Sequence, residues 1–221
     1  MNALSNWWPA GTVYGTLLNF QAECTAMAPQ ITQPPYKAAP RAPVLFIKTA
    51  NTWSASSSAI CLPAHVPQVE VGATVAVVVG PRTGAGESPV PVAGYVLMND
   101  LSVPHASFFR PPVKFKCLDG FLGIGPLFVG TAQAGDPARF SLQVRINGDL
   151  RQTMAFAGLV RNAQQLLADV DAFMTLREGD VLMLGCDVGR PLAGVGDCIE
   201  ISTPGRPDFG ILSSTMVAEA L

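Results

Sequence analysis

The sequence predicts a mainly β domain of the α+β class with one packed helix. Short runs rich in β-branched and aromatic residues recur along the 221-residue chain, and Gly and Pro residues separate them. One longer segment instead repeats its apolar residues with the spacing of a helix. The expected strands are residues 12–18, 44–47, 74–79, 94–98, 140–146, 181–184, 198–201 and 210–217.

The helix prediction rests on residues 161–173. Apolar residues recur there at three- and four-residue spacing, and polar residues occupy the opposite face. The apolar set is Ala163, Leu166, Leu167, Val170 and Phe173. We expect this helix to pack on the core and to be followed by a turn at 178–180, and we expect a shorter helix at 21–27.

Turns and loops separate the strands. Asn147 and Gly148 predict a tight turn after the strand at 140–146, because both residues adopt positive φ readily. The Gly and Pro residues of 123–126 predict another turn. Small polar residues predict a loop at 53–58, and Pro-rich composition predicts long loops at 29–43 and 80–91.

Composition limits the classes of partner. Charged residues make up 14% of the chain and hydrophobic residues 49%, whereas about 25% of an average soluble protein is charged. The net charge is −2 and no basic run is present, which argues against nucleic acid. No apolar run approaches the roughly 20 residues that span a bilayer, so no membrane partner is expected. The shortage of charge favours an oligomer, in which a partner subunit covers part of the surface.

Cysteine and histidine usage points to no familiar metal site. The five cysteines are odd in number and never form a Cys-x-x-Cys pair, so a zinc ribbon or a disulfide scaffold is not expected. The start of the chain lacks the basic and apolar stretches of a secretory signal. We therefore expect a reduced, cytoplasmic protein whose cysteines fill apolar space. His65 and His105 lie among Pro and small residues and are expected in surface loops.

The most informative stretch runs from residue 94 to residue 126. A predicted strand ends there in the carboxylate of Asp100, and cations and the carboxylate of Asp119 follow. Together with residues 46–49 and 17–20, this arrangement resembles the fumarylacetoacetate hydrolase family.

The resemblance extends over residues 11–217, nearly the whole chain. It implies a mixed β-roll or barrel with one packed helix. We expect a single domain of this type over residues 1–221, in which residues 1–10 form an N-terminal extension.

A narrower likeness is carried by residues 11–15, 109–111 and 116–120. These motifs are similar to the decarboxylase/isomerase enzymes of 4-hydroxyphenylacetate (homoprotocatechuate) degradation, in which two copies of the fold are fused. The resemblance implies that this chain is the first copy, made as a separate subunit. It also implies small oxo-di- or tricarboxylate substrates: 5-carboxymethyl-2-oxo-hex-3-ene-dioate for decarboxylation and 2-hydroxyhepta-2,4-diene-dioate for isomerisation.

The family resemblance implies a site for Mg²⁺ or a similar divalent ion, held by a Glu-x-Glu pair and an Asp. Alternate residues of a strand face the same side, so two such carboxylates converge on one hard cation. In this chain Asp100 matches the Asp, but Gly72 and Thr74 replace the two glutamates. Glu70 is displaced by roughly 6–7 Å along the strand. We therefore expect a vestigial metal site, and a positively charged pocket that binds no divalent ion tightly.

Two further family features are altered. A His-x-x-Glu pair on a short lid is replaced here by Glu23 and Ala26. Glu23 is interpreted either as a general base or as a carboxylate on the surface of the lid. The family's Thr-Gly-Thr-Pro substrate loop is altered at residues 184–187, where it keeps only the glycine.

The cationic part of the family's site is retained. The resemblance implies that Lys116 and Asp100 are catalytic. It also implies that the substrate is bound by Lys48, Arg110, Asn19 and Asp119. Carboxylate substrates need such cations, and Arg can bind a carboxylate through two hydrogen bonds.

Structural alternatives exist for each charged candidate. Lys116 and Asp119 can form a buried pair that fixes the loop before residue 123. Asp100 can cap its own turn or pair with Lys116. Lys48 and Arg110 can be solvated surface charges.

Three functional hypotheses follow. In the first, this chain lacks the metal and pairs with a paralogous, metal-bearing subunit in a decarboxylase/isomerase. In the second, it is a metal-independent lyase in which Lys116 and Arg110 stabilise the dienolate. In the third, it is a purely structural partner of the metal-bearing subunit. A homo-oligomer and a broader 2-oxo acid substrate also stay open.

Overall fold

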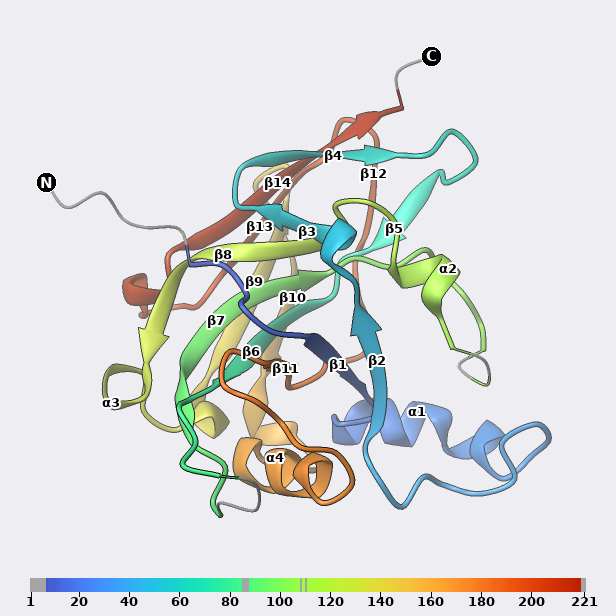
Figure 1. The fold of residues 1–221 in the computed structure, drawn as a ribbon. Coiled ribbons are helices and arrows are strands. Elements are labelled where there is room, and N and C mark those ends of the chain that lie inside the picture. The colour runs from blue at the N-terminus through green and yellow to red at the C-terminus, as the bar shows by residue number, and fades with distance from the viewer. Residues whose placement is uncertain (1–6, 85–87, 108, 110, 220–221) are drawn as a thin grey trace, which may run out of the picture.

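The computed structural model describes residues 7–84, 88–107, 109 and 111–219. Two β-sheets pack against each other, and Figure 1 shows the larger one curling into a half-barrel with α4 at one end. The expected mainly β class is confirmed, and the helix predicted at 161–173 forms and packs on the core.

The larger sheet has seven strands in the order β2-β1-β11-β6-β7-β8-β3. The pairs β1–β11 and β3–β8 are parallel and the others are antiparallel, so the sheet is mixed, as expected. Its strands are β1 (Val13–Leu17), β2 (Val44–Lys48), β3 (Trp53–Ala55), β6 (Ala73–Val79), β7 (Val92–Asp100), β8 (Leu122–Gly130) and β11 (Val181–Met183).

The second sheet has five strands in the order β10-β9-β13-β14-β4, and β5 and β12 form a separate pair. The tight turn predicted at Asn147 and Gly148 is confirmed, because both residues have positive φ and join β9 to β10. The strands are β4 (Ser58–Leu62), β5 (Gln68–Glu70), β9 (Ser141–Ile146), β10 (Asp149–Ala155), β12 (Leu192–Gly194), β13 (Cys198–Ser202) and β14 (Ile211–Ala218).

The helices are short and lie at the margins of the sheets. The α-helices are α1 (Gln21–Ile31), α2 (Val113–Lys116), α3 (Thr131–Ala134) and α4 (Ala163–Asp171). Single 3₁₀ turns occur at Ala50–Thr52, Pro137–Arg139, Phe156–Gly158 and Pro207–Phe209. Helix α1 begins where the shorter helix was predicted but continues through Pro29, into a segment predicted as loop.

Helix α4 agrees with its sequence pattern except at its end. The side chain of Asn162 accepts a hydrogen bond from the backbone N–H of Gln165, which caps the first turn. The predicted apolar residues within the helix are buried, whereas Phe173 lies beyond the last turn and is 59% exposed. The prediction that Phe173 packs on the core is therefore wrong.

Two loop predictions are also wrong. Residues 53–58 contain β3 and the start of β4, because β3, although only three residues long, pairs in parallel with β8. Residues 123–126 lie inside β8 rather than in a turn. Gly125 allows a close approach to Leu97 of β7, and the register of the two strands shifts at this point. A glycine and a proline at a bulge are compatible with a strand.

Alternating residues of β6 pack in two separate clusters. Val75 and Val77 belong to the core between the sheets, and Ala76 and Val78 belong to a second cluster inside the curl of the larger sheet. Because both faces of β6 are buried, its sequence is apolar at every position except Thr74. Thr74 follows the same alternation, so its side chain lies on the inner face of the curl.

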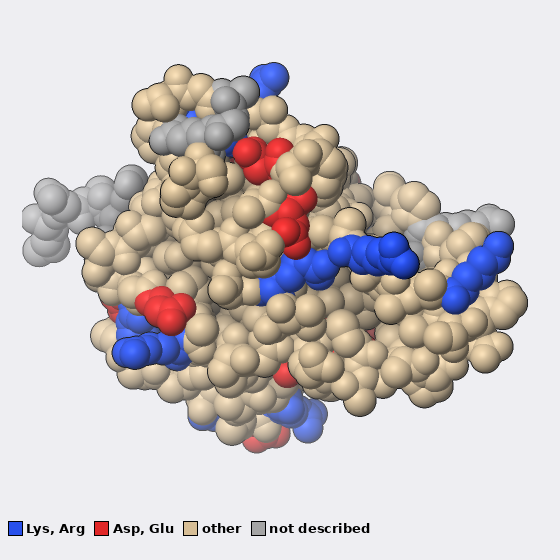
Figure 2. Space-filling view, turned by 90° about the horizontal axis from the view of Figure 1, so that it is seen from below, with Lys and Arg blue, Asp and Glu red and all other residues tan. Residues whose placement is uncertain are grey.

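The surface carries few charges, in agreement with the composition. Figure 2 shows Lys, Arg, Asp and Glu side chains scattered among other residues on one face. Within the described part of the chain, no helix is long and apolar enough to cross a bilayer.

Candidate active site

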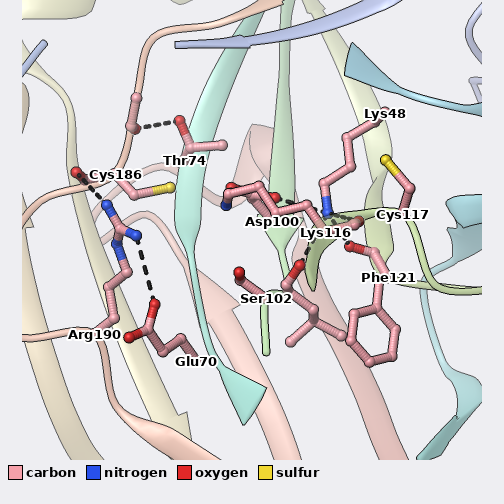
Figure 3. A network of polar contacts seen from close by, with 12 residues as sticks. Lys48, Glu70, Thr74, Asp100, Ser102, Lys116, Cys117, Phe121, Cys186 and Arg190 are labelled. Carbon is pink, nitrogen blue, oxygen red and sulfur yellow. Dashed lines mark hydrogen bonds and ion pairs between the residues drawn. The ribbon is translucent and has the colours of Figure 1, made fainter. Parts of the chain in front are cut away.

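An ion pair joins two strands that are far apart in the order of the larger sheet. Lys48 ends β2 and Asp100 ends β7, and three strands separate them. At about 4.8 Å per strand, a flat sheet would hold them roughly 19 Å apart. The ammonium of Lys48 nevertheless lies 2.8 Å from Oδ1 of Asp100. The curl of the sheet therefore brings both side chains to one mouth of the half-barrel (Figure 3).

The ammonium group of Lys48 is fully engaged by protein atoms. Besides its ion pair with Asp100, it donates to the backbone carbonyls of Leu101 (2.9 Å), Lys116 (2.6 Å) and Phe121 (2.8 Å). The residue is 1% exposed, so the alternative of a solvated surface charge is wrong. An ammonium has three N–H donors, and these acceptors use all of them. Lys48 therefore fixes the geometry of the site.

Lys116 has a different environment. Its ammonium donates to Oδ2 of Asp100 at 2.5 Å and lies 4.5 Å from the centre of the Phe46 ring. It also lines a cavity of about 510 Å³ whose other walls are mostly apolar. Among the described residues Asp100 accepts a hydrogen bond from this ammonium, and the Lys116 side chain is 0% exposed, so Lys116 is as buried as Lys48 but donates to fewer protein atoms.

The pKa values of the pair favour the charged forms at neutral pH. Burial alone raises the pKa of Asp100, but the ammonium groups of Lys116 and Lys48 outweigh it and lower the pKa to about 2. Burial lowers the pKa of Lys48 to about 8, although the nearby carboxylate opposes this shift. Asp100 is thus a carboxylate held between two cations.

The other expected site residues are not gathered at this mouth. Asp119 is exposed and accepts a hydrogen bond from Nδ2 of Asn51 at 2.6 Å, so the proposed Lys116–Asp119 pair is wrong. Asp100 takes that place as the partner of Lys116. Arg110 lies outside the described residues, but its neighbours Phe109 and Pro111 line the cavity.

Asn19 is buried and holds two segments together. Its Nδ2 donates to the carbonyls of Leu184 (2.9 Å) and Arg161 (3.1 Å), and its Oδ1 accepts from the backbone N–H of Arg161 (3.0 Å). The residue is 1% exposed. Asn19 therefore positions the loop after β11, the one that replaces the family's substrate loop.

The positions that match the family's metal ligands do not fit a divalent ion. Thr74 donates its hydroxyl to the carbonyl of Gly185 at 2.6 Å, and Gly72 has no side chain. Both oxygens of Asp100 contact lysines. In the described structure no group of three or more His, Cys, Asp or Glu side chains is placed to hold a metal ion. A hard divalent cation needs several oxygen ligands, which these residues do not supply.

A second ionic cluster lies beside these positions and contains a residue that the sequence analysis missed. Nη2 of Arg190 lies 2.8 Å from Oε1 of Glu23, and its Nη1 lies 3.6 Å from Oε2 of Glu70. Oε2 of Glu23 also accepts from the backbone N–H of Leu18 at 2.6 Å. Glu23 is 6% exposed, so the interpretation as a carboxylate on the lid surface is wrong. The Gly-Arg-Pro sequence around Arg190 matches no motif, and no sequence signal marked it.

Positive charge does not dominate this mouth. Among the described residues, the ammonium groups of Lys48 and Lys116 face one carboxylate, and the guanidinium of Arg190 faces two. The charges of the two clusters together balance, whereas the positive charge expected of the pocket around Asp100 stays a prediction, because Arg110 lies outside the described residues.

Comparison with known proteins agrees with this architecture. A family model described as "Fumarylacetoacetate (FAA) hydrolase C-terminal" matches residues 12–217. The 4-hydroxyphenylacetate degradation bifunctional isomerase/decarboxylase of Salmonella dublin is 36% identical over 212 residues, which cover 95% of this chain and 48% of that protein. The Escherichia coli protein of the same name is 36% identical over 200 residues, with 89% and 46% coverage. The chain thus spans about half the length of the curated relatives it matches.

Solved structures share the fold. A fumarylacetoacetate hydrolase family protein from Yersinia pestis CO92 has a TM-score of 0.79 and 24% identity, with coverage of 95% of this chain and 94% of that one. A fumarylpyruvate hydrolase from Pseudomonas aeruginosa, in complex with Mn²⁺ and pyruvate, has a TM-score of 0.77 and 21% identity, with coverage of 96% and 91%.

Proposed function

The chain belongs to the fumarylacetoacetate hydrolase family, and from this membership we propose that it is one subunit of a decarboxylase/isomerase of 4-hydroxyphenylacetate degradation. The substrates proposed for the assembly are 5-carboxymethyl-2-oxo-hex-3-ene-dioate and, after loss of CO₂, 2-hydroxyhepta-2,4-diene-dioate. The relatives are about twice as long as the matched segment, and their names describe bifunctional enzymes. Both facts support an assembly of two such domains.

One observation carries this proposal: Lys116, held by Asp100, lies in the wall of a cavity of about 510 Å³. Volumes of this size accommodate small metabolites. Loss of the carboxylate on C5 as CO₂ breaks a C–C bond whose electron pair passes through the 3,4 double bond to the 2-oxo group, which leaves a dienolate whose oxygen carries negative charge. A positioned ammonium in a mostly apolar cavity stabilises such charge strongly, because little water screens it.

The other residues receive supporting roles in this proposal. Asp100 orients the ammonium of Lys116, and Lys48 orients Asp100. Arg110 is proposed as a receptor for a second carboxylate, because the described walls of the cavity are mostly apolar. Asn19 is proposed to influence substrate binding indirectly, by positioning the loop after β11. Asp119 does not pair with Lys116, and its role in substrate binding stays a proposal.

The divalent ion is proposed to belong to a companion subunit. The oxygens at Gly72, Thr74 and Asp100 do not form a ligand set in this chain. A paralogous subunit with an intact Glu-x-Glu and Asp set would supply the metal. The five cysteines are free, which supports the proposed reducing, cytoplasmic environment.

A second candidate function is a non-catalytic partner of that companion. Asp100 neutralises part of the charge of both lysines, and large apolar side chains beside the cavity are exposed: Ile47 by 50%, Phe109 by 56% and Val113 by 59%. Exposed apolar groups of this kind are typical of interfaces.

Replacement of Lys116 by Met in the complete assembly separates the two functions. If the ammonium stabilises the dienolate, Lys116→Met lowers decarboxylation by about 10²–10³-fold, while size-exclusion chromatography shows an intact assembly. The matched control is Lys114→Met, which removes an exposed lysine from the same helix. Unchanged turnover in an intact Lys116→Met assembly would instead support the structural partner.

A further inference from the structure

The guanidinium of Arg190 links three segments at the mouth of the curled sheet. It pairs with Glu23 of α1 at 2.8 Å and with Glu70 of β5 at 3.6 Å. Its Nη2 also lies 3.4 Å from the carbonyl of Cys186, in the loop after β11. Figure 3 shows Arg190 directed toward Glu70 and Cys186 from its position two residues before β12.

The same loop lies against both positions at which the family's glutamates are missing. A Cβ added to Gly72 would lie 3.1 Å from Sγ of Cys186. The hydroxyl of Thr74 donates to the carbonyl of the adjoining Gly185 at 2.6 Å. The positive charge of Arg190 is therefore placed next to the region in which a divalent ion would be expected.

We propose that Arg190 is the internal counter-ion of this site, and that its guanidinium replaces a divalent cation in joining Glu23 and Glu70. The inference rests on the proposed function, in which this chain holds no metal. A guanidinium can bridge two carboxylates because its N–H donors point in different directions within one plane. The bridge ties the first turn of α1 to β5 and to the loop after β11, which carries Arg190, without any bound ion.

The positive charge of Arg190 neutralises the carboxylates of Glu23 and Glu70, so its removal should change the stability of the folded chain. Burial raises the pKa of Glu23, and Arg190 opposes that shift. The other titratable groups facing the cluster are Cys24, Asp100, Lys116 and Cys186. Without Arg190, two carboxylates would share a partly buried site, and only protons or an added cation could neutralise them.

The variant Arg190→Met tests the proposal in the full chain. Its unfolding midpoint temperature should fall relative to wild type, and the deficit should grow as pH rises above 4.5, the ordinary pKa of a Glu such as Glu23, because Glu23 ionises there in the unfolded chain while burial raises its pKa in the folded chain. Millimolar Mn²⁺ should restore much of the lost midpoint temperature by binding the vacated carboxylates, with at least about a tenfold gain in the folded-to-unfolded ratio. Wild type should show no such response to Mn²⁺.

Three further variants keep the test decisive. Arg190→Lys retains a positive charge and should lose less stability, with little response to Mn²⁺. The triple variant Glu23→Gln, Glu70→Gln, Arg190→Met removes all the charges and should be more stable than Arg190→Met at neutral pH. Arg82→Met breaks a comparably buried pair with Asp171 at another place, and its stability should not respond to Mn²⁺.

The outcomes separate the inference from the proposed function. If wild type itself binds Mn²⁺ stoichiometrically, the proposed metal-free subunit is wrong, and the inference that rests on it falls as well. If wild type binds none and Arg190→Met responds to neither pH nor Mn²⁺, only the role of Arg190 is overturned. Should Arg190→Met fail to fold, recovery by Mn²⁺ or by the two glutamine substitutions supports the inference, and failure of both overturns it.

Discussion

The ammonium of Lys48 lies 2.8 Å from the carboxylate of Asp100, although three strands separate β2 from β7 in the sheet. This contact spans the curl of the half-barrel and is reinforced by three backbone carbonyls that accept from the same ammonium. The site is therefore part of the fold: the residues that orient Lys116 also hold the sheet closed.

Replacement of Lys48 by Met should strongly destabilise the chain. The substitution leaves Asp100 with one cationic partner and three carbonyls without their donor. Breaking a buried pair in this way costs about 3–5 kcal/mol of unfolding free energy. Urea denaturation measures the loss, and Lys114→Met, which removes an exposed lysine, should change the free energy by less than about 1 kcal/mol. A loss of similar size in both variants would contradict the structural role of Lys48.

Acid should lower the unfolding free energy of the chain by protonating Asp100. The pKa of Asp100 is about 2 in the folded chain and has an ordinary value of 3.8. Between these values the unfolded chain binds more protons, so the unfolding free energy falls as pH decreases through this window. The shift corresponds to about 2 kcal/mol, fully present above the ordinary pKa. In Asp100→Asn this acid-dependent decrease in unfolding free energy should disappear. If the variant still shows the same decrease at low pH, other carboxylates cause it.

The thiol of Cys186 should be unreactive in the native chain. Burial raises its pKa to about 12, and the side chain is 6% exposed. Since the thiolate is the nucleophile, a thiol-specific reagent at mildly alkaline pH should modify Cys61 and Cys198, which are exposed, and spare Cys186. Mass spectrometry of the digested chain identifies the modified residues. Rapid native-state labelling of Cys186 would show that the mouth of the half-barrel is open to solvent.

The cap of α4 should contribute measurably to stability. Asn162→Ala removes the side-chain acceptor for the N–H of Gln165 and should lower the unfolding free energy by about 1 kcal/mol. Gln164→Ala, at an exposed position in the first turn of the same helix, provides the matched control. An equal loss in both variants would show that general helix propensity, not the cap, sets the difference.

The fold was largely predictable from the sequence because most strands and α4 have a strong local pattern. Val75, Val77 and their neighbours predict a buried strand on composition alone. The missed strands depend on tertiary contacts instead: β3 is only three residues long and pairs with β8, and Gly125 and Pro126 lie at a bulge rather than in a turn. Local signals contain no information about such pairing.

The site was predictable only where the resemblance to the family named a position. Asp100 and Lys116 form an ion pair, which is one of the two structural alternatives considered for Asp100 from the sequence. The burial of Lys48 follows from the curl of the sheet, which no local pattern reveals. The pair between Glu23 and Arg190 joins residues 167 positions apart, and a single sequence gives no indication of that contact.

The central claim is that this chain holds no divalent ion of its own. A crystal structure of the chain alone, grown with Mn²⁺ and oxalate, tests it most directly, because Mn²⁺ scatters anomalously and oxalate imitates a 2-oxo acid. We expect no anomalous peak near Asp100, Thr74 or Gly72, with Lys116 still bound to Asp100 and Arg190 bound to Glu23. An anomalous peak within about 2.5 Å of a carboxylate oxygen of Asp100, at full occupancy, would contradict the account.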